Sequence, residues 1–374
     1  MYLFLYLYVF LLKFIYFFLK LFPIKNKIVF VSRQSDKPSL DLLMLAKKIN
    51  ELDKDVKVVF VTKRATKNVV AILKSSIILL RQMYHMATSK VCITDGYNIA
   101  VSVLNHKKRL IIVQLWHSLG AIKKFGYQTL YSSRDKRIAE IMKMHKNYDY
   151  VNGCSKGMIK YYSKAFGYEE DKLYPFGLPR VDYLISNYDS MKDKVYSIYP
   201  KLKNKKIILY IPTFRDNDNY KINELISSID LEKYVLIIKK HPRMNVQIDP
   251  QDGLYICNEF NSFSLLPVAD YIITDYSGMM IEAAAIDKPI YLYVHDLDDY
   301  KNNPGINMNL ENEFKGYVFK DASDLYNCLD SQKYNYSLLE KFKNKYVVSI
   351  KGDITDNIAN FILEKGVYNS ESKN

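Results

Sequence analysis

The chain has 374 residues, enough for two domains, because a single hydrophobic core usually stops growing at about 250–300 residues. Hydrophobic residues make up 49% and charged residues 25%, which excludes a disordered chain, and the four cysteines lie too far apart to indicate a disulfide framework or a zinc site. The formal net charge of +14 indicates an anionic partner such as phosphate-rich substrate, acidic lipid or nucleic acid, although lysines that only solubilise helices are an equal alternative.

Residues 1–22 are apolar or aromatic except for Lys13 and Lys20. The segment lacks the basic start and the small residues before a cleavage site that characterise a signal peptide. A spanning helix needs about 20 apolar residues, and Lys13 interrupts the run. We therefore predict a helix in the membrane interface, where Tyr and Lys keep their polar ends in water. A spanning helix and a helix docked on the protein itself are the alternatives.

After Pro23 the sequence alternates apolar strands with helices. In the first half we predict strands at 27–31, 56–62, 90–95, 109–117 and 148–152, and helices at about 38–52, 68–86, 134–146 and 155–166. The stretch 177–206 breaks this rhythm with Pro179, Pro200 and the polar run KLKNKK, which indicates a domain junction. The pattern restarts with KIILYIPTF, YVLIIKKHP, LYICN, YIITDYS and PIYLYVHD.

The predicted strands are nearly continuous apolar runs, as is typical of parallel strands covered by helices on both faces. We therefore predict an α/β protein with two Rossmann-like domains facing each other, 23–190 and 191–374, preceded by the helix at 1–22. A polar tail follows Val367.

Polar side chains follow four of the predicted strands. Because ligands of open α/β sheets bind beyond the carboxyl ends of the strands, these side chains indicate a binding site. They are His117 and Ser118 after one strand, Pro212, Thr213, Phe214, Arg215 and Asp216 after another, Lys239, Lys240, His241 and Pro242 after a third, and Asp275, Tyr276, Ser277 and Gly278 after a fourth.

The residue types at these strand ends favour a phosphate ligand. Ser277 and Gly278 precede the helix MMIEAAAID, whose free N–H groups and dipole attract anions, although a simple helix cap is the alternative. The cluster Lys239, Lys240 and His241 adds positive charge. Arg180 has the planar fork that suits bidentate phosphate contact, and a surface ion pair is its more ordinary use.

His117 is the candidate proton acceptor, because imidazole titrates near neutral pH. It lies in QLWHSLGAIKKFG, at a strand end followed by a lysine-rich loop. The alternative is a structural histidine in a turn, which is how we interpret His85, His106, His145 and His295.

Five ordered segments resemble the CDP-glycerol glycerophosphotransferase family, which includes teichoic-acid primases, polymerases and ribitol-phosphate transferases. They are LWHSLGAIKKFGY, FGLPRVD, YIPTFRD, KKHP and ITDYSGMMIEAA, and the resemblance covers most of residues 27–365. It implies a GT-B-like fold with the donor in a cleft between two Rossmann-like domains, an acceptor-side domain at 23–190 and a CDP-donor domain at 191–374. It also implies membrane association at the cytoplasmic face.

The resemblance also implies roles for particular residues. His117 matches the family's general base, and His241 matches a second histidine that steadies the donor phosphates. The expected donor-binding residues are Ser118, Leu119, Gly120, Ala121, Arg180, Pro212, Thr213, Lys239, Lys240, Ser277, Gly278 and Glu282. The chain departs from the family pattern at three places. It has His-Ser-Leu-Gly where the family often has His-Gly-Thr, Asp-Tyr-Ser-Gly where the family has Asp-Tyr-Ser-Ser, and Glu282 where the family has Asp. Its His-x-x-Gly-x-x-Lys-Lys form is closer to the ribitol-phosphate enzymes.

The implied reaction is direct displacement at phosphorus: an acceptor hydroxyl attacks the polyol-bearing β-phosphate of a CDP-polyol, and CMP leaves. We expect a lipid-linked wall-polymer acceptor and an anionic membrane surface as partners, and a homo-oligomer is left open. We expect no cofactor and no metal, and we interpret the acidic turn HDLDDY as exposed to solvent. A GT-B glycosyltransferase that uses a sugar nucleotide is the enzymatic alternative. A nucleic-acid binder is disfavoured because the lysines are dispersed and no such module is present.

Overall fold

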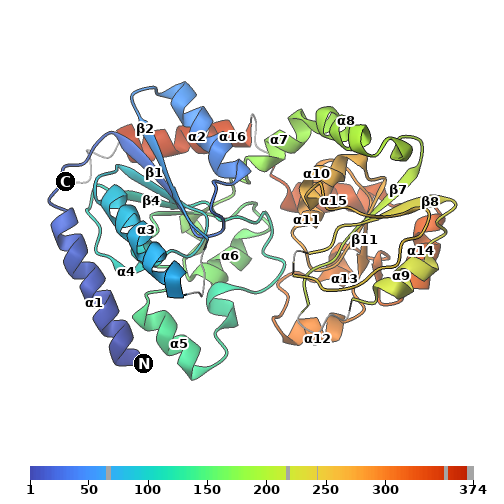
Figure 1. Cartoon of the computed structure of the whole chain (residues 1–374), viewed down its shortest axis with the longest axis horizontal. Coiled ribbons are helices and arrows are strands. Elements are labelled where there is room, and N and C mark those ends of the chain that lie inside the picture. The colour runs from blue at the N-terminus through green and yellow to red at the C-terminus, as the bar shows by residue number, and fades with distance from the viewer. Residues whose placement is uncertain (65–68, 216–219, 242, 349–352, 369–374) are drawn as a thin grey trace. The chain divides into compact units, whose positions relative to one another are not determined.

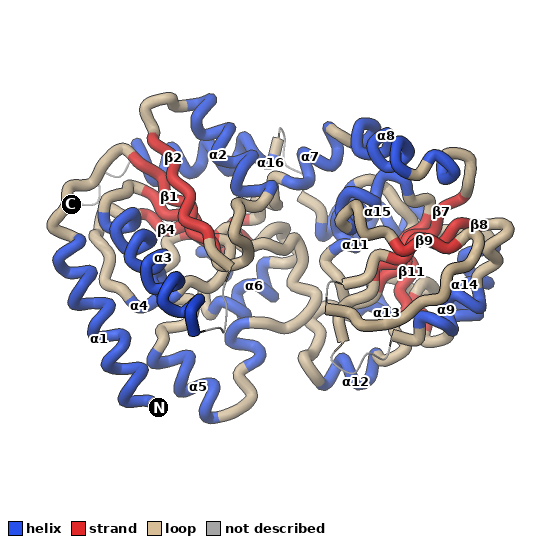
Figure 2. Tube along the Cα trace, in the orientation of Figure 1, coloured by secondary structure: helices blue, strands red, loops and turns tan. Residues whose placement is uncertain are grey.

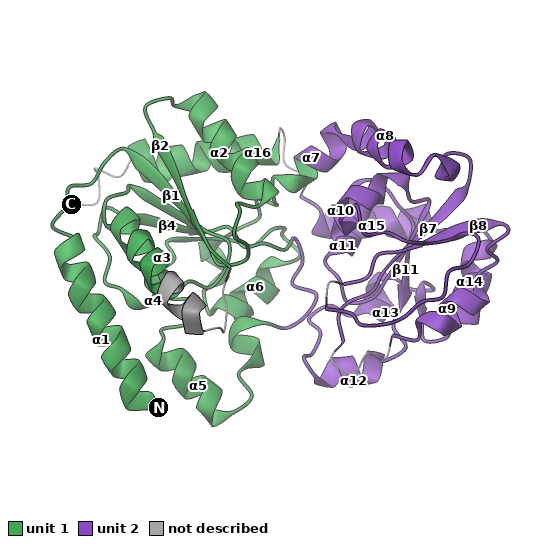
Figure 3. Cartoon of the chain, in the orientation of Figure 1, with its two compact units in different colours: residues 1–118, 125–182, 350–374 green, residues 119–124, 183–349 purple. Residues whose placement is uncertain are grey.

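The computed structural model describes residues 1–64, 69–215, 220–241, 243–348 and 353–368 (Figure 1). The chain forms two compact units (Figure 3). Unit 1 comprises residues 1–118, 125–182 and 350–374, and unit 2 comprises residues 119–124 and 183–349. Asp216 and Pro242, which belong to two of the predicted motifs, lie outside the described residues.

Unit 1 is built on a six-stranded parallel sheet with the order β2-β1-β3-β4-β5-β6. The strands are β1 (Lys27–Ser32), β2 (Lys57–Thr62), β3 (Val91–Thr94), β4 (Ile111–Gln114), β5 (Tyr150–Asn152) and β6 (Leu173–Tyr174). Both β1 and β3 are buried along their whole length, as their apolar sequences predict. The chain leaves β1 toward β2 and resumes at β3 on the other side, so the topological switch point lies between β1 and β3.

Helices surround this sheet (Figure 2). They are α1 (Tyr2–Leu19), α2 (Leu40–Leu52), α3 (Val69–Ala87), α4 (Ile99–Val103), η1 (Gly126–Thr129), α5 (Ser133–Ile141), α6 (Ile159–Phe166), η2 (Glu170–Lys172), α16 (Ile354–Ile362) and the π-helical turn η5 (Leu363–Tyr368). The chain leaves unit 1 within α7 (Arg180–Ser186).

The C-terminal segment packs within unit 1. Helix α16 buries Ile354, Ile358 and Ile362 and packs against α2. Farther along, a Cβ atom at Gly366 would lie only 2.4 Å from the side chain of Val91 in β3. The division predicted from the sequence placed all of 191–374 in the second domain, whereas the structure returns the last helix to the first. The sequence pattern of an amphipathic helix does not indicate which of two sheets the helix will cover.

Helix α1 contacts unit 1 along a narrow stripe formed by Val9, Leu12 and Tyr16. The hydroxyl of Tyr16 lies 3.0 Å from Nδ1 of His106, whose Nε2 donates to the carbonyl of Val101 at 2.8 Å, so the Tyr16 hydroxyl is the donor. Most of the other side chains of the helix are apolar and exposed, and by length and composition α1 could cross a membrane. One side of the helix is therefore docked on the protein, as in one of the predicted alternatives, and the other side is an exposed apolar face.

Unit 2 has its own six-stranded parallel sheet, with the order β12-β11-β10-β7-β8-β9. The strands are β7 (Lys206–Ile211), β8 (Tyr234–Ile238), β9 (Leu254–Ile256), β10 (Tyr271–Thr274), β11 (Ile290–Tyr293) and β12 (Val318–Phe319). Because the chain runs outward from β7 to β9 and resumes at β10 beside β7, the switch point lies between β7 and β10.

The helices of unit 2 lie around this sheet and connect its strands. They are α8 (Tyr188–Ile198), η3 (Pro200–Leu202), α9 (Ile222–Ser228), α10 (Ser262–Leu265), η4 (Leu266–Val268), α11 (Met279–Ala285), α12 (Leu297–Asn302), α13 (Leu310–Glu313), α14 (Ala322–Asp330) and α15 (Tyr336–Tyr346). Two parallel sheets of this kind confirm the predicted pair of Rossmann-like α/β units.

Candidate active site

His117 lies at the switch point of unit 1, where β1, β3 and β4 end. Its Nδ1 is 2.7 Å from the backbone oxygen of Asp95, the residue after β3. A carbonyl oxygen only accepts hydrogen bonds, so Nδ1 carries the proton and Nε2 of the neutral ring is the proton acceptor. The side-chain amide nitrogen of Gln34, just beyond β1, lies 3.4 Å from the same nitrogen; because both nitrogens carry protons, this is a contact and not a hydrogen bond.

The backbone before His117 is held in an unusual conformation. Trp116 has φ of 63°, in the left-handed region that bulky residues rarely adopt. Its N–H donates to the side-chain oxygen of Gln114 at 3.0 Å, and its ring stacks on Phe125 with 4.7 Å between centroids. The Trp116 ring also lies against His117, at 4.2 Å. This turn directs the imidazole toward Asp95 and explains why β4 ends at Gln114 rather than at the predicted 117.

The surroundings of His117 favour its neutral form. Burial lowers the pKa of the imidazole, and the nearby Arg180 guanidinium lowers it further, while the bond to the Asp95 carbonyl and the charge of Asp41 act in the opposite direction. The net result is a pKa below the ordinary histidine value, so the ring is unprotonated at neutral pH. A neutral imidazole with an available Nε2 lone pair can accept a proton.

Arg180 forms an ion pair with Asp41. Its Nε lies 2.9 Å from one carboxylate oxygen of Asp41, its Nη2 contacts the same oxygen, and its backbone N–H donates to the other at 2.8 Å. The Nη2 group also donates to the backbone oxygen of His117 at 3.2 Å. Asp41 is 2% exposed. Arg180 therefore lies beside the candidate base. Its guanidinium group forms an ion pair with a carboxylate, which is the alternative to phosphate binding.

The other predicted strand ends meet at the switch point of unit 2, where they line a cavity of about 420 Å³. Its lining combines cations with hydroxyl, amide and aromatic groups. The lining residues are Lys123, Ile211, Pro212, Thr213, Phe214, Lys239, Lys240, His241, Arg243, Asn261, Ser262, Ser277 and Met279. Six of the predicted donor-binding or catalytic residues in unit 2 are thus brought together: Pro212, Thr213, Lys239, Lys240, His241 and Ser277.

A buried ionic network joins the two loops that flank this switch point. The Asp275 carboxylate accepts from the backbone N–H of Thr213 at 2.9 Å, from its hydroxyl at 2.6 Å and from Nη1 of Arg215 at 2.9 Å. Arg215 also donates to Asp296 at 2.6 Å. Burial alone would raise the pKa of the Asp296 carboxyl, but the hydrogen bond and the charge of Arg215 lower it below its ordinary value. The network fixes the loop after β7 against the loop after β10.

His241 has the opposite tautomer to His117. The backbone N–H of Arg243 donates to Nδ1 of His241 at 3.2 Å, so in the neutral ring Nε2 carries the proton and is a donor. Burial and the charges of Arg243 and Lys123 lower the pKa of this imidazole. The ring also lies against Phe214, with 5.3 Å between centroids. His241 therefore offers an N–H group to an anion, whereas His117 offers a lone pair.

The two lysines beside His241 are anchored through their ammonium groups. Lys239 Nζ donates to the carbonyl of Cys257 at 2.9 Å, and Lys240 Nζ donates to the carbonyl of Val246 at 3.0 Å. An ammonium group has three donors, so each lysine keeps hydrogen-bonding capacity beyond these contacts. Together with Lys123 and Arg243 they give the cavity four cationic side chains.

Lys123 reaches this cavity because the chain passes briefly into unit 2 after Ser118. Residues 119–124 pair with the turn at 305–307: Asn307 N–H donates to the carbonyl of Ile122 at 2.8 Å, and Lys124 N–H to that of Gly305 at 2.9 Å. Burial lowers the pKa of the Lys123 ammonium, while Asp275 raises it. Sequence reasoning noted a lysine-rich loop here but did not assign Lys123 to the site.

Several other predicted donor-binding residues have packing roles. Leu119 and Ala121 are buried, and a Cβ at Gly120 would lie 2.6 Å from Ile281 of α11. Glu282 is 3% exposed within α11. Gly278 has an ordinary φ of −59°, so its position does not require glycine.

Two predicted serines have their own local partners. The Ser277 hydroxyl accepts from the backbone N–H of Met279, the first residue of α11, at 3.3 Å, although the N-cap residue of this helix is Gly278. The backbone oxygen of Ser118 in unit 1 accepts from the hydroxyl of Tyr162 at 2.5 Å and from the thiol of Cys154. Ser118 is therefore fixed beside His117 by its main chain.

Sequence reasoning missed several residues of these two sites. Gln34 and Asp95 follow strands at the same sheet edge as His117, so the strand-end rule could have found them. Lys123, Arg243 and Asn261 line the unit 2 cavity from loops, and Ser262 lines it from the first residue of α10. No periodicity marks such loop residues, so only the folded chain brings them to the cavity.

Known proteins resemble this chain over most of its length. The sequence profile of the CDP-glycerol:poly(glycerophosphate) glycerophosphotransferase family matches residues 14–364. The chain belongs to this family. It is 27% identical to the teichoic acid ribitol-phosphate primase of Bacillus spizizenii over 91% of this chain and 92% of the primase. It is 33% identical to the teichoic acid glycerol-phosphate primase of Bacillus subtilis over 77% of each chain.

The fold of this family member is also that of a solved relative. The wall teichoic acid polymerase TagF superimposes with a TM-score of 0.72 and 17% identity, covering 91% of this chain and 90% of that chain. The likeness confirms the predicted GT-B-like fold class. The family profile, which matches residues 14–364, confirms that the five motifs found in the sequence identified the family correctly.

Proposed function

We propose that this glycerophosphotransferase family member transfers glycerol phosphate or ribitol phosphate from a CDP-polyol to a hydroxyl of a wall teichoic acid acceptor and releases CMP. The observation that carries the proposal is the pair of opposite histidine tautomers. His117 has a lone pair at Nε2 to accept a proton, and His241 has an N–H at Nε2 to hold an anion. Relatives named as polyol-phosphate primases support the same reaction.

In this proposal the unit 2 cavity holds the donor diphosphate. Lys123, Lys239, Lys240 and Arg243 neutralise its charge, and His241 donates one hydrogen bond. Such fixed donors and cations stabilise the charge that develops as the bond between the β-phosphorus and the CMP oxygen breaks. The Asp275–Arg215–Asp296 network keeps the cavity loops in place before the donor binds.

His117 is the general base of the proposed reaction. It removes the proton from the acceptor hydroxyl as the hydroxyl oxygen attacks the β-phosphorus, and the polyol phosphate is transferred. Arg180 acts through His117: it holds the backbone oxygen of that residue, and its charge adds to burial in lowering the pKa of the imidazole. Arg180 is therefore proposed as a positioning residue, in place of the donor-phosphate contact expected from the sequence.

We also propose that the enzyme works at the cytoplasmic face of the cell membrane as a peripheral or monotopic protein. Support comes from α1, whose outer face exposes large apolar side chains while Val9, Leu12 and Tyr16 dock on unit 1. A helix attached to its own domain along one side and apolar on the other suits a position in the membrane interface. The net charge of +14 favours the same anionic surface.

A donor panel tests the proposed function. Purified protein is incubated with a lipid-linked teichoic acid acceptor and, in separate reactions, CDP-glycerol, CDP-ribitol and a UDP-sugar. We expect CMP release with one of the CDP-polyols and a product whose mass increases by the corresponding polyol phosphate. Release of UDP with transfer of a sugar would establish the glycosyltransferase alternative instead and overturn the proposal.

A further inference from the structure

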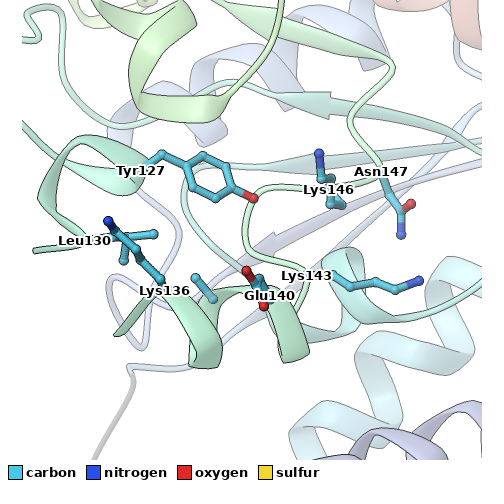
Figure 4. A pocket seen from close by; sticks show the side chains of 8 residues that line it. Tyr127, Leu130, Lys136, Glu140, Lys143, Lys146 and Asn147 are labelled. Carbon is cyan, nitrogen blue, oxygen red and sulfur yellow. The ribbon is translucent and has the colours of Figure 1, made fainter. Parts of the chain in front are cut away.

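Unit 1 contains two adjoining cavities, whose lining residues lie away from the strand ends. One, of about 760 Å³, opens between Tyr127 of η1 and helix α5 (Figure 4). The other, of about 380 Å³, adjoins it across Leu130 and Ala139, which line both. The smaller cavity is mostly apolar, with Ile138, Met142 and Met144 among its lining residues. The smaller cavity and the residues shared by both offer apolar surface of a size that accommodates part of a hydrocarbon chain.

The larger cavity has a cationic rim. Lys136, Lys143 and Lys146 line it, and within the described part of the chain none of the three forms an ion pair. The acidic lining residue, Glu140, is paired with Arg137 at 3.0 Å. Three lysines in the larger cavity stand against Glu140 there and Asp135 in the smaller one, so the rim keeps a net positive charge next to the apolar residues of the smaller cavity. A molecule that joins an apolar chain to a phosphate group has the complementary chemistry.

The backbone that carries this rim is shaped in an unusual way. Lys143, His145 and Asn147 all have positive φ, of 46°, 57° and 72°. The Asn147 amide anchors the turn by donating to the carbonyl oxygens of Val101 and Leu104, both at 2.9 Å. Three left-handed non-glycine residues in five positions carry a conformational cost, and such strain gathers at binding sites.

A row of ring contacts connects this cavity with the candidate base. The Tyr127 ring, which lines the cavity, lies 6.1 Å from the buried His145 ring. The His145 ring lies 6.4 Å from Trp116, and Trp116 lies 4.2 Å from His117. Three successive ring contacts therefore link the cavity wall to the residue that we propose to deprotonate the acceptor.

One wall of the cavity, helix α5, packs against α1, the helix that we propose lies at the membrane. Between these two helices, Nη2 of Arg137 donates to the hydroxyl of Tyr6 at 2.9 Å. A lipid that leaves the bilayer along the apolar face of α1 would meet α5 and the lysine rim next.

We propose that this cavity binds the lipid-linked acceptor, with its hydrocarbon chain along Leu130 and Ala139 and its phosphate at Lys136, Lys143 and Lys146. The inference rests on the proposed function and adds to it the site of the second substrate. It commits to one ligand class, a polyprenyl or acyl chain joined to a phosphate-bearing glycan. Bulk anionic phospholipid is the competing occupant that the test must separate.

Binding can be measured directly, because Trp116 is the single tryptophan of the chain and reports on its ring contacts. The probes are farnesyl phosphate, farnesol, inorganic phosphate and phosphatidylglycerol vesicles, each titrated into the full-length protein. We expect a saturable change in Trp116 emission with farnesyl phosphate. Farnesol and inorganic phosphate should bind about tenfold or more weakly, because each offers half of the complementary chemistry.

Two matched pairs of variants test the rim. Lys136→Gln with Lys146→Gln should weaken farnesyl phosphate binding by about tenfold or more, because both lost charges face the phosphate. Lys156→Gln with Lys172→Gln changes two exposed lysines of unit 1 that do not line the cavity, and should bind like the native protein. Equal binding by both pairs would overturn the proposal. So would an emission change with phosphatidylglycerol vesicles of the same size and the same dependence on Lys136 and Lys146.

Kinetics separates this inference from the proposed function. With the lipid-linked acceptor varied at saturating CDP-polyol, the Lys136/Lys146 variant should show a higher KM for the acceptor and a much smaller change in kcat. An unchanged acceptor KM would count against the cavity while leaving the reaction intact. If the native protein released no CMP from either CDP-polyol, the proposed function would fail, and the farnesyl phosphate titration would still decide what the cavity binds.

Discussion

At the scale of single residues, the backbone decides what each candidate histidine can do. His117 donates a hydrogen bond from Nδ1 to the carbonyl of Asp95, and His241 accepts a hydrogen bond at Nδ1 from the N–H of Arg243. One imidazole is left with a lone pair and the other with an N–H at Nε2. Two residues of the same type thus acquire different chemistry from one hydrogen bond each.

Replacement of His117 by Ala should remove the general base. We expect transfer to fall by about 10²–10⁴-fold, the range that a positioned base contributes. Affinity for the CDP-polyol should persist, because the cationic cavity of unit 2 is untouched. Steady-state CMP release and equilibrium binding of CDP-glycerol measure the two effects. Native rates from the variant would show that another group accepts the proton.

Replacement of Arg180 by Gln should alter the pH profile. Its positive charge lowers the pKa of the His117 imidazole, and the Asp41 carboxylate that it neutralises raises it. In the variant the lowering effect of Arg180 is lost and the Asp41 carboxylate is no longer neutralised, and both changes raise the pKa of His117. Because the base works only unprotonated, the acid limb of kcat/KM should move to higher pH.

The control for this prediction is Lys47→Gln, which removes a cation that is 81% exposed on α2. Its pH profile should follow that of the native protein. A purely structural role for Arg180 would lower the rate of the Gln variant at every pH and leave the acid limb in place.

At the scale of elements, the return of α16 to unit 1 depends on a cap supplied from elsewhere. Asp353, at the start of the helix, makes no side-chain cap. Instead the Asp182 carboxylate accepts from the N–H groups of Ile354 and Thr355 at 3.1 and 2.7 Å, and from the Thr355 hydroxyl at 2.5 Å. These bonds satisfy donors that every helix start leaves open.

Asp182→Ala should therefore loosen the C-terminal helix. We expect a loss of about 1–3 kcal/mol in the free energy of unfolding of unit 1, because a helix cap and a further hydrogen bond disappear together. Urea unfolding followed by circular dichroism measures the change, and amide exchange in α16 locates it. Asp171→Ala, at an exposed position of unit 1, should stay within about 0.5 kcal/mol of the native protein.

Helix α1 gives a prediction about the membrane. Phe10 and Phe14 are 67% and 54% exposed on its outer face. Replacement of both by Ser should weaken binding to anionic vesicles by about tenfold or more, since each buried phenyl ring contributes roughly 1.5–3 kcal/mol.

Co-sedimentation with vesicles of phosphatidylglycerol measures this binding. Leu43→Ser, which alters an apolar side chain of α2 that is 48% exposed, is the control and should sediment like the native protein. Undiminished sedimentation of the double variant would assign the tether to the basic surface alone.

At the scale of the whole molecule, the two units divide the substrates between them in our proposal. CDP-glycerol should slow amide exchange at 212–215, 239–241 and 277–279 in unit 2. Farnesyl phosphate should slow it around 136–147 in unit 1. Hydrogen exchange with mass spectrometry distinguishes these segments. Donor protection confined to unit 1 would contradict the assignment of the diphosphate to the cavity of unit 2.

Much of the fold was predictable because apolar runs of four to six residues mark buried parallel strands. The segments β1, β7 and β10 lie where their sequences place them. The short strands β6 and β12 were missed, since two residues show no periodicity. The predicted strand at 109–117 was too long, because the left-handed Trp116 ends the extended backbone before His117.

The candidate site was predictable to a similar extent. The strand-end rule and the family motifs selected His117, His241 and the lysines beside the latter, and these lie at the two switch points. Arg180 has the right charge, but its partner Asp41 lies 139 residues earlier in the chain. No local pattern could predict that pairing.

The sequence by itself determined the alternation of strands and helices, the family and the side chains that carry charge, because these follow from residue type and spacing along the chain. Only the tertiary structure decided the tautomer of each histidine, the partner of Arg180, the place of Lys123 and the return of the last helix to the first unit. The physical reason is that hydrogen bonds and ion pairs form between groups that are close in space. Which groups those are depends on how the sheets assemble, and a local sequence pattern does not contain that information.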